Sequence, residues 1–324
     1  AFSPLSKEGL WTTREIRDEL NHTQDQIIRS NFVRTYLKAR GLSKAAATVW
    51  NPVSANRNPL SNILLFLGGG HFYPRGAWSG VRALMAEAFP STNKASREKM
   101  LRWARLGITH ENVDAEMIRD IGRAARKSPD QMTFLEKVML LPGKYWMGGD
   151  AIFKIMTFES LMHDWGKAHP EWSVKQLEEF CARRTLDQMP TYSRTPRIIK
   201  SLRFVPLADF PMWTAEVIRT TANNVIQIKE ELADPRTRKI GLKHLAGLTA
   251  AYSIPTLLAG YALQQSGMSG QDDEDMRHFV PSWSKYSDLA WIKKGERLYY
   301  VDIGFTDPYS YFKKAIVALW QGDT

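Results

Sequence analysis

His163, Asp164 and His169 lie in the stretch of this chain whose residue types best suit a metal ion. Imidazole and carboxylate groups are common ligands of zinc. On a helix, however, side chains share a face when they are three or four positions apart, whereas these histidines are six apart. Gly166 and Pro170 also favour a break in the helix. We therefore interpret the histidines as solvated residues at a helix end and expect no metal site.

The other patterns that usually mark catalysis or cofactor binding are missing from the sequence. It contains neither His-Glu-x-x-His nor Gly-x-Ser-x-Gly. The glycines at 68–70 lack the spacing of a nucleotide loop and favour close packing or a hinge. The acidic run Asp272–Asp275 lacks calcium-loop spacing and favours a solvated helix start, and Cys181 favours a buried position. We expect no catalytic residue and no cofactor, although carboxylates distant in sequence could still form an acid–base pair.

Basic residues are better organised than acidic ones. The chain has 44 Lys and Arg against 34 Asp and Glu, a net charge of +10, which favours anionic partners such as double-stranded DNA. Several cations recur at steps of three or four, which places like charges on one helix face. The alternative is a set of solvated faces with local glutamate partners. The candidates for non-specific DNA contact are Arg119, Arg123, Arg126, Arg194, Arg197, Lys200 and Arg203.

Helical periodicity dominates the chain up to about residue 265. Ser173 can cap a helix together with Gln176, and a long helix is predicted from Pro211 to a point before Pro235. Shorter separate helices are predicted over 133–141 and 150–165, and a last one from Asp307-Pro308. Two short strands, 288–292 and 297–303, flank a Lys-Lys-Gly-Glu turn. The predicted fold is mainly α and multi-helical, with one small β-hairpin near the C-terminal end.

Three regions are expected along the chain. Residues 1–130 and 131–268 form helical regions, and residues 269–324 form a small α+β tail. The chain starts at Ala1 rather than Met and stops without a capping motif. We therefore expect it to be a piece of a longer polypeptide.

The stretch 245–263 contains no charged residue. Its 19 residues would extend about 28 Å as a helix, nearly the thickness of a bilayer core. Pro255, Gly247 and Gly260 weaken that interpretation and favour a buried apolar helix pair. The alternative is a surface for lipid or a partner subunit, with Leu257, Leu258 and Tyr261 as the contact candidates.

Four stretches in the second half of the chain resemble segments of very large bacteriophage proteins, the internal virion or ejection proteins that leave the capsid with the genome. The closing part reads Asp-Asp-Glu-Asp-Met-Arg-His-Phe-Val-Pro-Ser-Trp from Asp272, followed by Leu298 to Leu319. The other two stretches are Met189 to Pro196 and Phe210 to Asn223. They mark no catalytic residue, and the first half of the chain resembles no family.

The resemblance implies a structural, helical segment that is packed in the virion. After ejection it would help to form or line a conduit for DNA across the host envelope, in the periplasm or inner membrane. Its expected partners are portal, tail or other internal virion proteins in an oligomeric assembly, double-stranded DNA, and the host membrane. The alternatives are a non-catalytic segment of a giant virion enzyme, such as an RNA polymerase or a peptidoglycan-lysing protein, and a peripheral membrane protein.

Overall fold

A computed structural model describes part of the chain, namely residues 2–4, 11–13, 51–73, 78, 94–109, 134–196, 199, 211–320 and 322. The chain divides into two compact units, residues 1–55 with 112–145, and residues 56–111 with 146–324. The expected borders near 130 and 268 do not coincide with these units. The rest of the description concerns the second unit.

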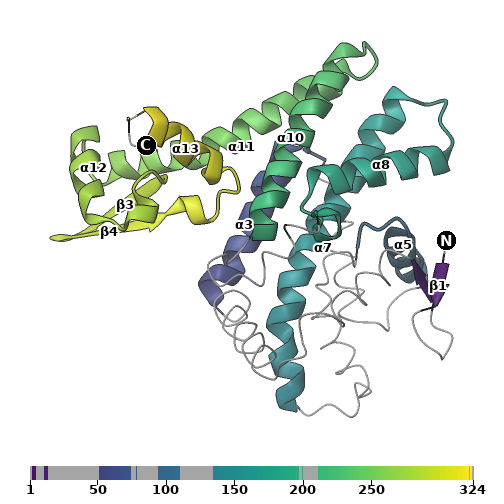
Figure 1. Ribbon diagram of the computed structural model, residues 1–324, viewed down its shortest axis with the longest axis horizontal. Helices are drawn as coiled ribbons and strands as arrows, with labels where there is room; N and C mark the ends of the chain where they lie inside the picture. The colour runs from purple at the N-terminus through teal and green to yellow at the C-terminus, as the bar shows by residue number, and fades with distance from the viewer. Residues whose placement is uncertain are drawn as a thin grey trace. The chain divides into compact units, whose positions relative to one another are not determined.

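The described residues are mainly helical, as predicted (Figure 1). The helices are α3 (Pro52–Gly68), α5 (Lys94–Arg105), α7 (Phe134–Ala168), α8 (Val174–Gln188), α10 (Pro211–Ala233), α11 (Arg238–Gln265), α12 (Gly270–Met276) and α13 (Ser310–Trp320). Single 3₁₀ turns occur at η2 (Tyr192–Arg194), η3 (Arg277–Phe279), η4 (Ser282–Ser284) and η5 (Ile303–Phe305). The strands β1 (Phe2–Pro4) and β2 (Trp11–Thr13) pair antiparallel and were not predicted.

The predicted hairpin near the C-terminal end is confirmed. It consists of β3 (Leu289–Lys294) and β4 (Arg297–Asp302), paired antiparallel from Leu289 opposite Asp302 to Lys294 opposite Arg297. Gly295 in the turn has φ +60, a conformation that glycine adopts without a steric penalty. The buried face of β3 lies against α11.

Two helix predictions that rest on local capping and proline signals are confirmed. Ser173 caps α8 and shares a reciprocal capping box with Gln176. The long helix α10 begins at Pro211 and ends two residues before Pro235. The acidic run is also a helix start, because Ser269 caps α12 and its hydrogen bonds lower the pKa of Asp272.

Three helix expectations were wrong. The separate helices predicted over 133–141 and 150–165 are one continuous helix, α7, which also runs through Gly166. The apolar helix pair predicted over 245–263 is one helix, α11. Ala251, Pro255 and Ala259 recur every four residues on the buried face of α11. We attribute the continuity to this packed face, whose burial outweighs the roughly 3 kcal/mol that proline costs inside a helix.

Two apolar clusters hold the second unit together. One lies between α5, α7 and α8 and includes Trp103, Phe158 and the fully buried Cys181. The other joins α3 and α11 to the start of α13 through Leu65, Ala251 and Tyr309. Among the residues that the structure describes, no helix is both long enough and apolar enough to span a membrane.

The glycine run at 68–70 mediates close packing, one of its two expected roles. Gly70 has φ +72, and a Cβ on it would lie 2.4 Å from the Cα of His244 on α11. A Cβ on Gly247 would lie 2.2 Å from the carbonyl oxygen of Leu67. The end of α3 and the helix α11 therefore touch backbone to backbone, at a distance that only glycine allows.

Candidate functional site

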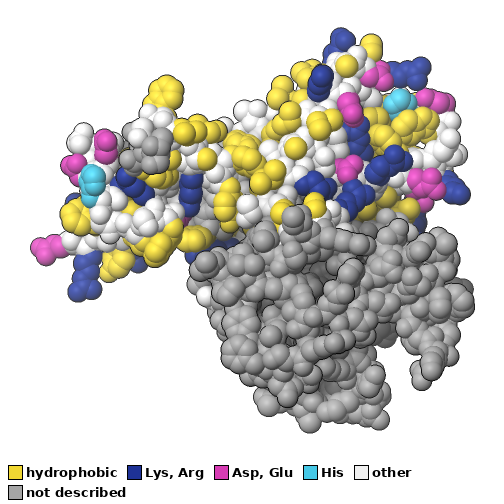
Figure 2. Space-filling model, in the orientation of Figure 1, with side chains coloured by type: hydrophobic (Ala, Val, Ile, Leu, Met, Phe, Trp, Pro, Cys, Tyr) yellow, Lys and Arg dark blue, Asp and Glu magenta, His cyan; other side chains and the backbone are white. Residues whose placement is uncertain are grey.

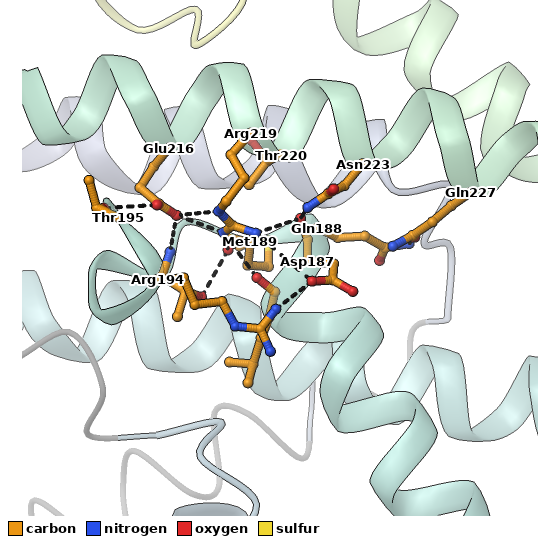
Figure 3. Close-up of polar contacts among 12 residues, drawn as sticks. Asp187, Gln188, Met189, Arg194, Thr195, Glu216, Arg219, Thr220, Asn223 and Gln227 are labelled. Atoms are coloured by element: carbon orange, nitrogen blue, oxygen red, sulfur yellow. Dashed lines mark hydrogen bonds and ion pairs between the residues drawn. The ribbon is translucent and has the colours of Figure 1, made fainter. Parts of the chain in front are cut away.

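A buried polar network joins the C-terminal end of α8, the turn that follows it, and the first half of α10 (Figure 3). The turn contains η2, and its residues 189–196 form one of the stretches that resemble phage proteins. The facing part of α10 belongs to a second such stretch, 210–223. The side chains of the network point toward one another across this junction (Figure 3).

Glu216 is the centre of the network and is fully buried. Its carboxylate accepts hydrogen bonds from the backbone N–H of Thr191 at 2.7 Å and from the hydroxyl of Thr195 at 2.9 Å. It also accepts from Nε and Nη2 of Arg219, at 3.0 and 2.6 Å. Both carboxylate oxygens are thus satisfied, which a buried charge requires.

Arg219 links this carboxylate to the end of α8. Its Nη2 donates to the carbonyl oxygens of Leu186 at 3.0 Å and Met189 at 3.2 Å, and its Nη1 donates to that of Asp187 at 3.4 Å. The last carbonyls of a helix have no partner within the helix and carry partial negative charge. The guanidinium group therefore caps α8 and neutralises Glu216 at the same time.

Two further contacts close the junction. Asn223 donates from Nδ2 to the carbonyl oxygen of Asp187 at 3.1 Å. The carboxylate of Asp187 forms an ion pair with Arg194 in the turn. Two side chains from α10 and one from the turn thus converge on the last turn of α8.

A second layer of buried polar side chains extends from Gln188 toward the end of α3. Its Nε2 donates to Oε1 of Gln227 at 2.8 Å, and its Oε1 lies 2.7 Å from Nε2 of His71. Burial lowers the pKa of His71 from 6.5 to about 3. His71 is therefore neutral at physiological pH, and because an amide oxygen can only accept, its Nε2 carries the hydrogen.

A third set of polar contacts lies between α10 and α11. Nδ1 of His244 lies 2.9 Å from Oε2 of Glu231, and its Nε2 lies 3.2 Å from Oδ1 of Asn224. All three side chains are buried. Arg184 on α8 approaches Oε1 of Glu231 at 3.5 Å. The packing of α10 against α11 thus includes polar as well as apolar contacts.

The polar groups of this region bind mainly to one another. Its charges are matched and its carboxylate oxygens face donors inside the protein. The nearby thiol, Cys181, has a pKa raised to about 12 by burial and stays protonated. The network can therefore fix the positions of four helices.

Arg194 is the one DNA-contact candidate within the described residues, and its partner is Asp187. Arg119, Arg123, Arg126, Arg197, Lys200 and Arg203 lie outside the described residues. Several other cations among the described residues also have carboxylate partners. Arg102 pairs with Glu178, Arg236 with Glu171 at 3.2 Å, and Lys243 with Asp164. For these described cations the structure favours the alternative of local acidic partners.

The two histidines of the metal interpretation lie in separate environments. His163 stacks on Tyr73 at 4.3 Å between ring centroids, whereas His169 stacks on Trp172 at 4.2 Å. The expectation of solvated histidines was wrong for His169, because its side chain is largely covered by these aromatic rings. Among the described residues, no three His, Cys, Asp or Glu side chains are grouped to hold a metal ion.

The contact candidates on α11 form an exposed apolar face. Leu257, Leu258 and Tyr261 are 68%, 53% and 62% exposed. Figure 2 shows further apolar side chains among Lys and Arg on the same C-terminal part of the chain. This surface is available to a partner subunit or to lipid.

The exposure of Leu257 and Leu258 predicts that the double substitution Leu257→Glu/Leu258→Glu leaves the fold intact. We expect a change of less than about 1 kcal/mol in the free energy of unfolding, measured by urea denaturation. The matched control is Ala251→Glu on the buried face of α11, which should cost several kcal/mol because it buries an unpaired charge. Comparable losses in both variants would place Leu257 and Leu258 in a core.

The central residues of the network were not identified from the sequence. Glu216 and Arg219 are three apart on a predicted helix, a spacing that marks an ion pair but does not show its burial. Gln188, Gln227, His71 and His244 carry no local signal, because their partners come from other elements.

In comparisons with protein-family models, with curated proteins and with solved structures, no match to this chain was found.

Proposed function

We propose that this chain is a structural segment of a bacteriophage internal virion protein that helps to form or line a conduit for genome delivery across the host envelope. One observation carries the proposal: the stretches that resemble phage proteins are hydrogen-bonded to each other in two pairs. Glu216 in 210–223 binds Thr191 and Thr195 in 189–196. Lys314 in 298–319 donates to the carbonyl oxygen of Trp283 in 272–283, at 3.0 Å.

These hydrogen bonds support a structural role, because the residues that form them hold helices and turns together. A catalytic resemblance would instead centre on a nucleophile, a base or a metal ligand. The net charge of +10 and the exposed apolar face of α11 suit the proposed partners, which are DNA, other virion proteins and the host membrane. The proposed location is the virion, and after ejection the periplasm or inner membrane of the host.

The location can be tested on particles of the phage that encodes the chain. Peptides from this chain should be found by mass spectrometry in purified full particles and should be depleted from particles that have ejected their DNA. The major capsid protein is the control, since it stays with the empty shell. A chain that is absent from full particles, or retained after ejection in the same ratio to capsid, would contradict the proposal.

A further inference from the structure

The outer edge of β4 in the hairpin β3–β4 is open. The inner face of β3 is covered, because Leu289 and Trp291 are buried and Nε1 of Trp291 donates to Asp273 at 2.6 Å. The only strand paired with β4 in the described part of the chain is β3. A two-stranded sheet is marginally stable in water, and an unpaired strand edge is a template for another strand.

The direction of the backbone groups on β4 follows from one hydrogen bond. The N–H of Ile303 donates to the carbonyl oxygen of Asp288, at 2.9 Å, so Ile303 faces the β3 side. Alternate residues of a strand direct their backbone groups to opposite sides. Arg297, Tyr299 and Val301 therefore also face β3. The backbone groups of Leu298, Tyr300 and Asp302 face outward.

Away from the turn, the outer face of the hairpin is apolar. It carries Ala290 opposite Val301 and Ile292 opposite Tyr299, and the side chains of Ile292, Tyr299 and Val301 are exposed. Because the sheet has only two strands in the described part of the chain, no further strand packs beside these side chains next to β4. The structure thus combines an open edge with side chains suited to cross-strand packing.

Charge separates along the hairpin. Its turn carries three cations, Lys293, Lys294 and Arg297, against Glu296. The other end has three carboxylates, Asp288 and the buried Asp302 and Asp307, and one cation, Lys313, which lies 3.3 Å from Asp288 and 2.7 Å from Asp307. An antiparallel neighbour of identical sequence would bring each positive turn to the negative end of the other copy.

We infer that β4 pairs edge to edge with β4 of a second copy of this chain. In the proposed pair a two-fold axis places Tyr300, the middle one of the three residues whose backbone groups face outward, opposite Tyr300 of the second copy. In this register Tyr299 lies opposite Val301 of the other copy on the outer face. Each such aromatic–β-branched pair favours association. The result is a four-stranded sheet with a continuous apolar row.

The inference names one partner in the assembly proposed above and rests on that proposal. The two can fail separately. A chain that is monomeric in solution yet present in full particles would contradict the edge pairing and leave the virion role standing.

The first test compares two exposed valines. The unmodified chain should show a concentration-dependent monomer–dimer equilibrium in sedimentation velocity. Val301→Lys should raise the dimer dissociation constant by about tenfold or more, since lysine on an edge strand opposes pairing. Val174→Lys, at a still more exposed valine on α8, should leave the constant unchanged. Equal effects of both substitutions, or a monomer at all concentrations, would overturn the inference.

The second test fixes the register and needs no destabilising change. Tyr299 and Val301 of the other copy would form a non-hydrogen-bonded pair, whose short separation suits a disulfide. Mild oxidation of an equal mixture of Tyr299→Cys and Val301→Cys chains should give a covalent dimer, whereas either variant alone should give little. Cys181 is buried and serves as the internal control. Equal cross-linking in all three samples would contradict this register. Vesicle binding by a strictly monomeric chain, abolished by Val301→Lys, would show that lipid occupies this surface instead.

Discussion

Replacing Arg219 with alanine is expected to cost roughly 3–5 kcal/mol of the free energy of unfolding, because it leaves the buried carboxylate of Glu216 without its cation. The same substitution removes the donors that cap the last carbonyls of α8. Urea denaturation followed by circular dichroism measures the loss. The control is Arg236→Ala, since Arg236 forms an exposed ion pair with Glu171 and should contribute about 0–1 kcal/mol.

A double variant separates the charge effect from simple loss of packing. Combining Arg219→Met with Glu216→Gln removes both charges and keeps most of the volume. We expect the double variant to be more stable than Arg219→Met alone, because no isolated charge stays buried. If Arg219→Ala costs no more than Arg236→Ala, the network does not hold the junction.

Lowering the pH from 7.5 to 5 is expected to cost about 2 kcal/mol of stability through His71 alone. The pKa of this group is 6.5 in the unfolded chain and about 3 in the folded protein. Below pH 6.5 the unfolded chain binds a proton that the folded protein does not. The stability is therefore complete above pH 6.5 and is lost as the pH falls toward 3. At pH 5 the size of the loss is set by the unfolded value, at RT ln(1 + 10^1.5).

The cause is burial, which outweighs the hydrogen bond to Gln188 and the charge of Asp164, both of which raise the pKa. The electrostatic effects of His244 and Lys243 lower it further. His71→Gln keeps a donor for Gln188 and should remove this part of the pH dependence in urea titrations at pH 7.5 and 5. His278→Gln, at an exposed histidine, should leave it in place. An unchanged pH dependence in His71→Gln would contradict the assignment.

Local signals were enough to predict much of the fold. The capping pair Ser173 and Gln176 predicts where α8 begins, and the residues around Gly295 predict the hairpin. In each case the deciding interaction lies within a few residues. The sequence therefore contains the answer without knowledge of the rest of the molecule.

Continuity of the long helices could not be predicted in the same way. The local cost of Pro255 argues for a break in α11, and only the packing of its buried face outweighs it. The same limit applies to the polar network. His71 and Gln188 are 117 positions apart, and Glu216 is 25 positions from Thr191. Such partners become visible only when the helices are packed.

The bonds around Glu216 and Arg219 also determine how the junction would respond to mechanical force. They cross between α8, the following turn and α10, and several of them share the same two side chains (Figure 3). A force applied along α10 would act on all of these bonds at once rather than on one after another. Sliding α10 by one helical turn, about 5.4 Å, would separate Glu216 from all its donors outside α10 at once. Under tension these hydrogen bonds should therefore break in a single step.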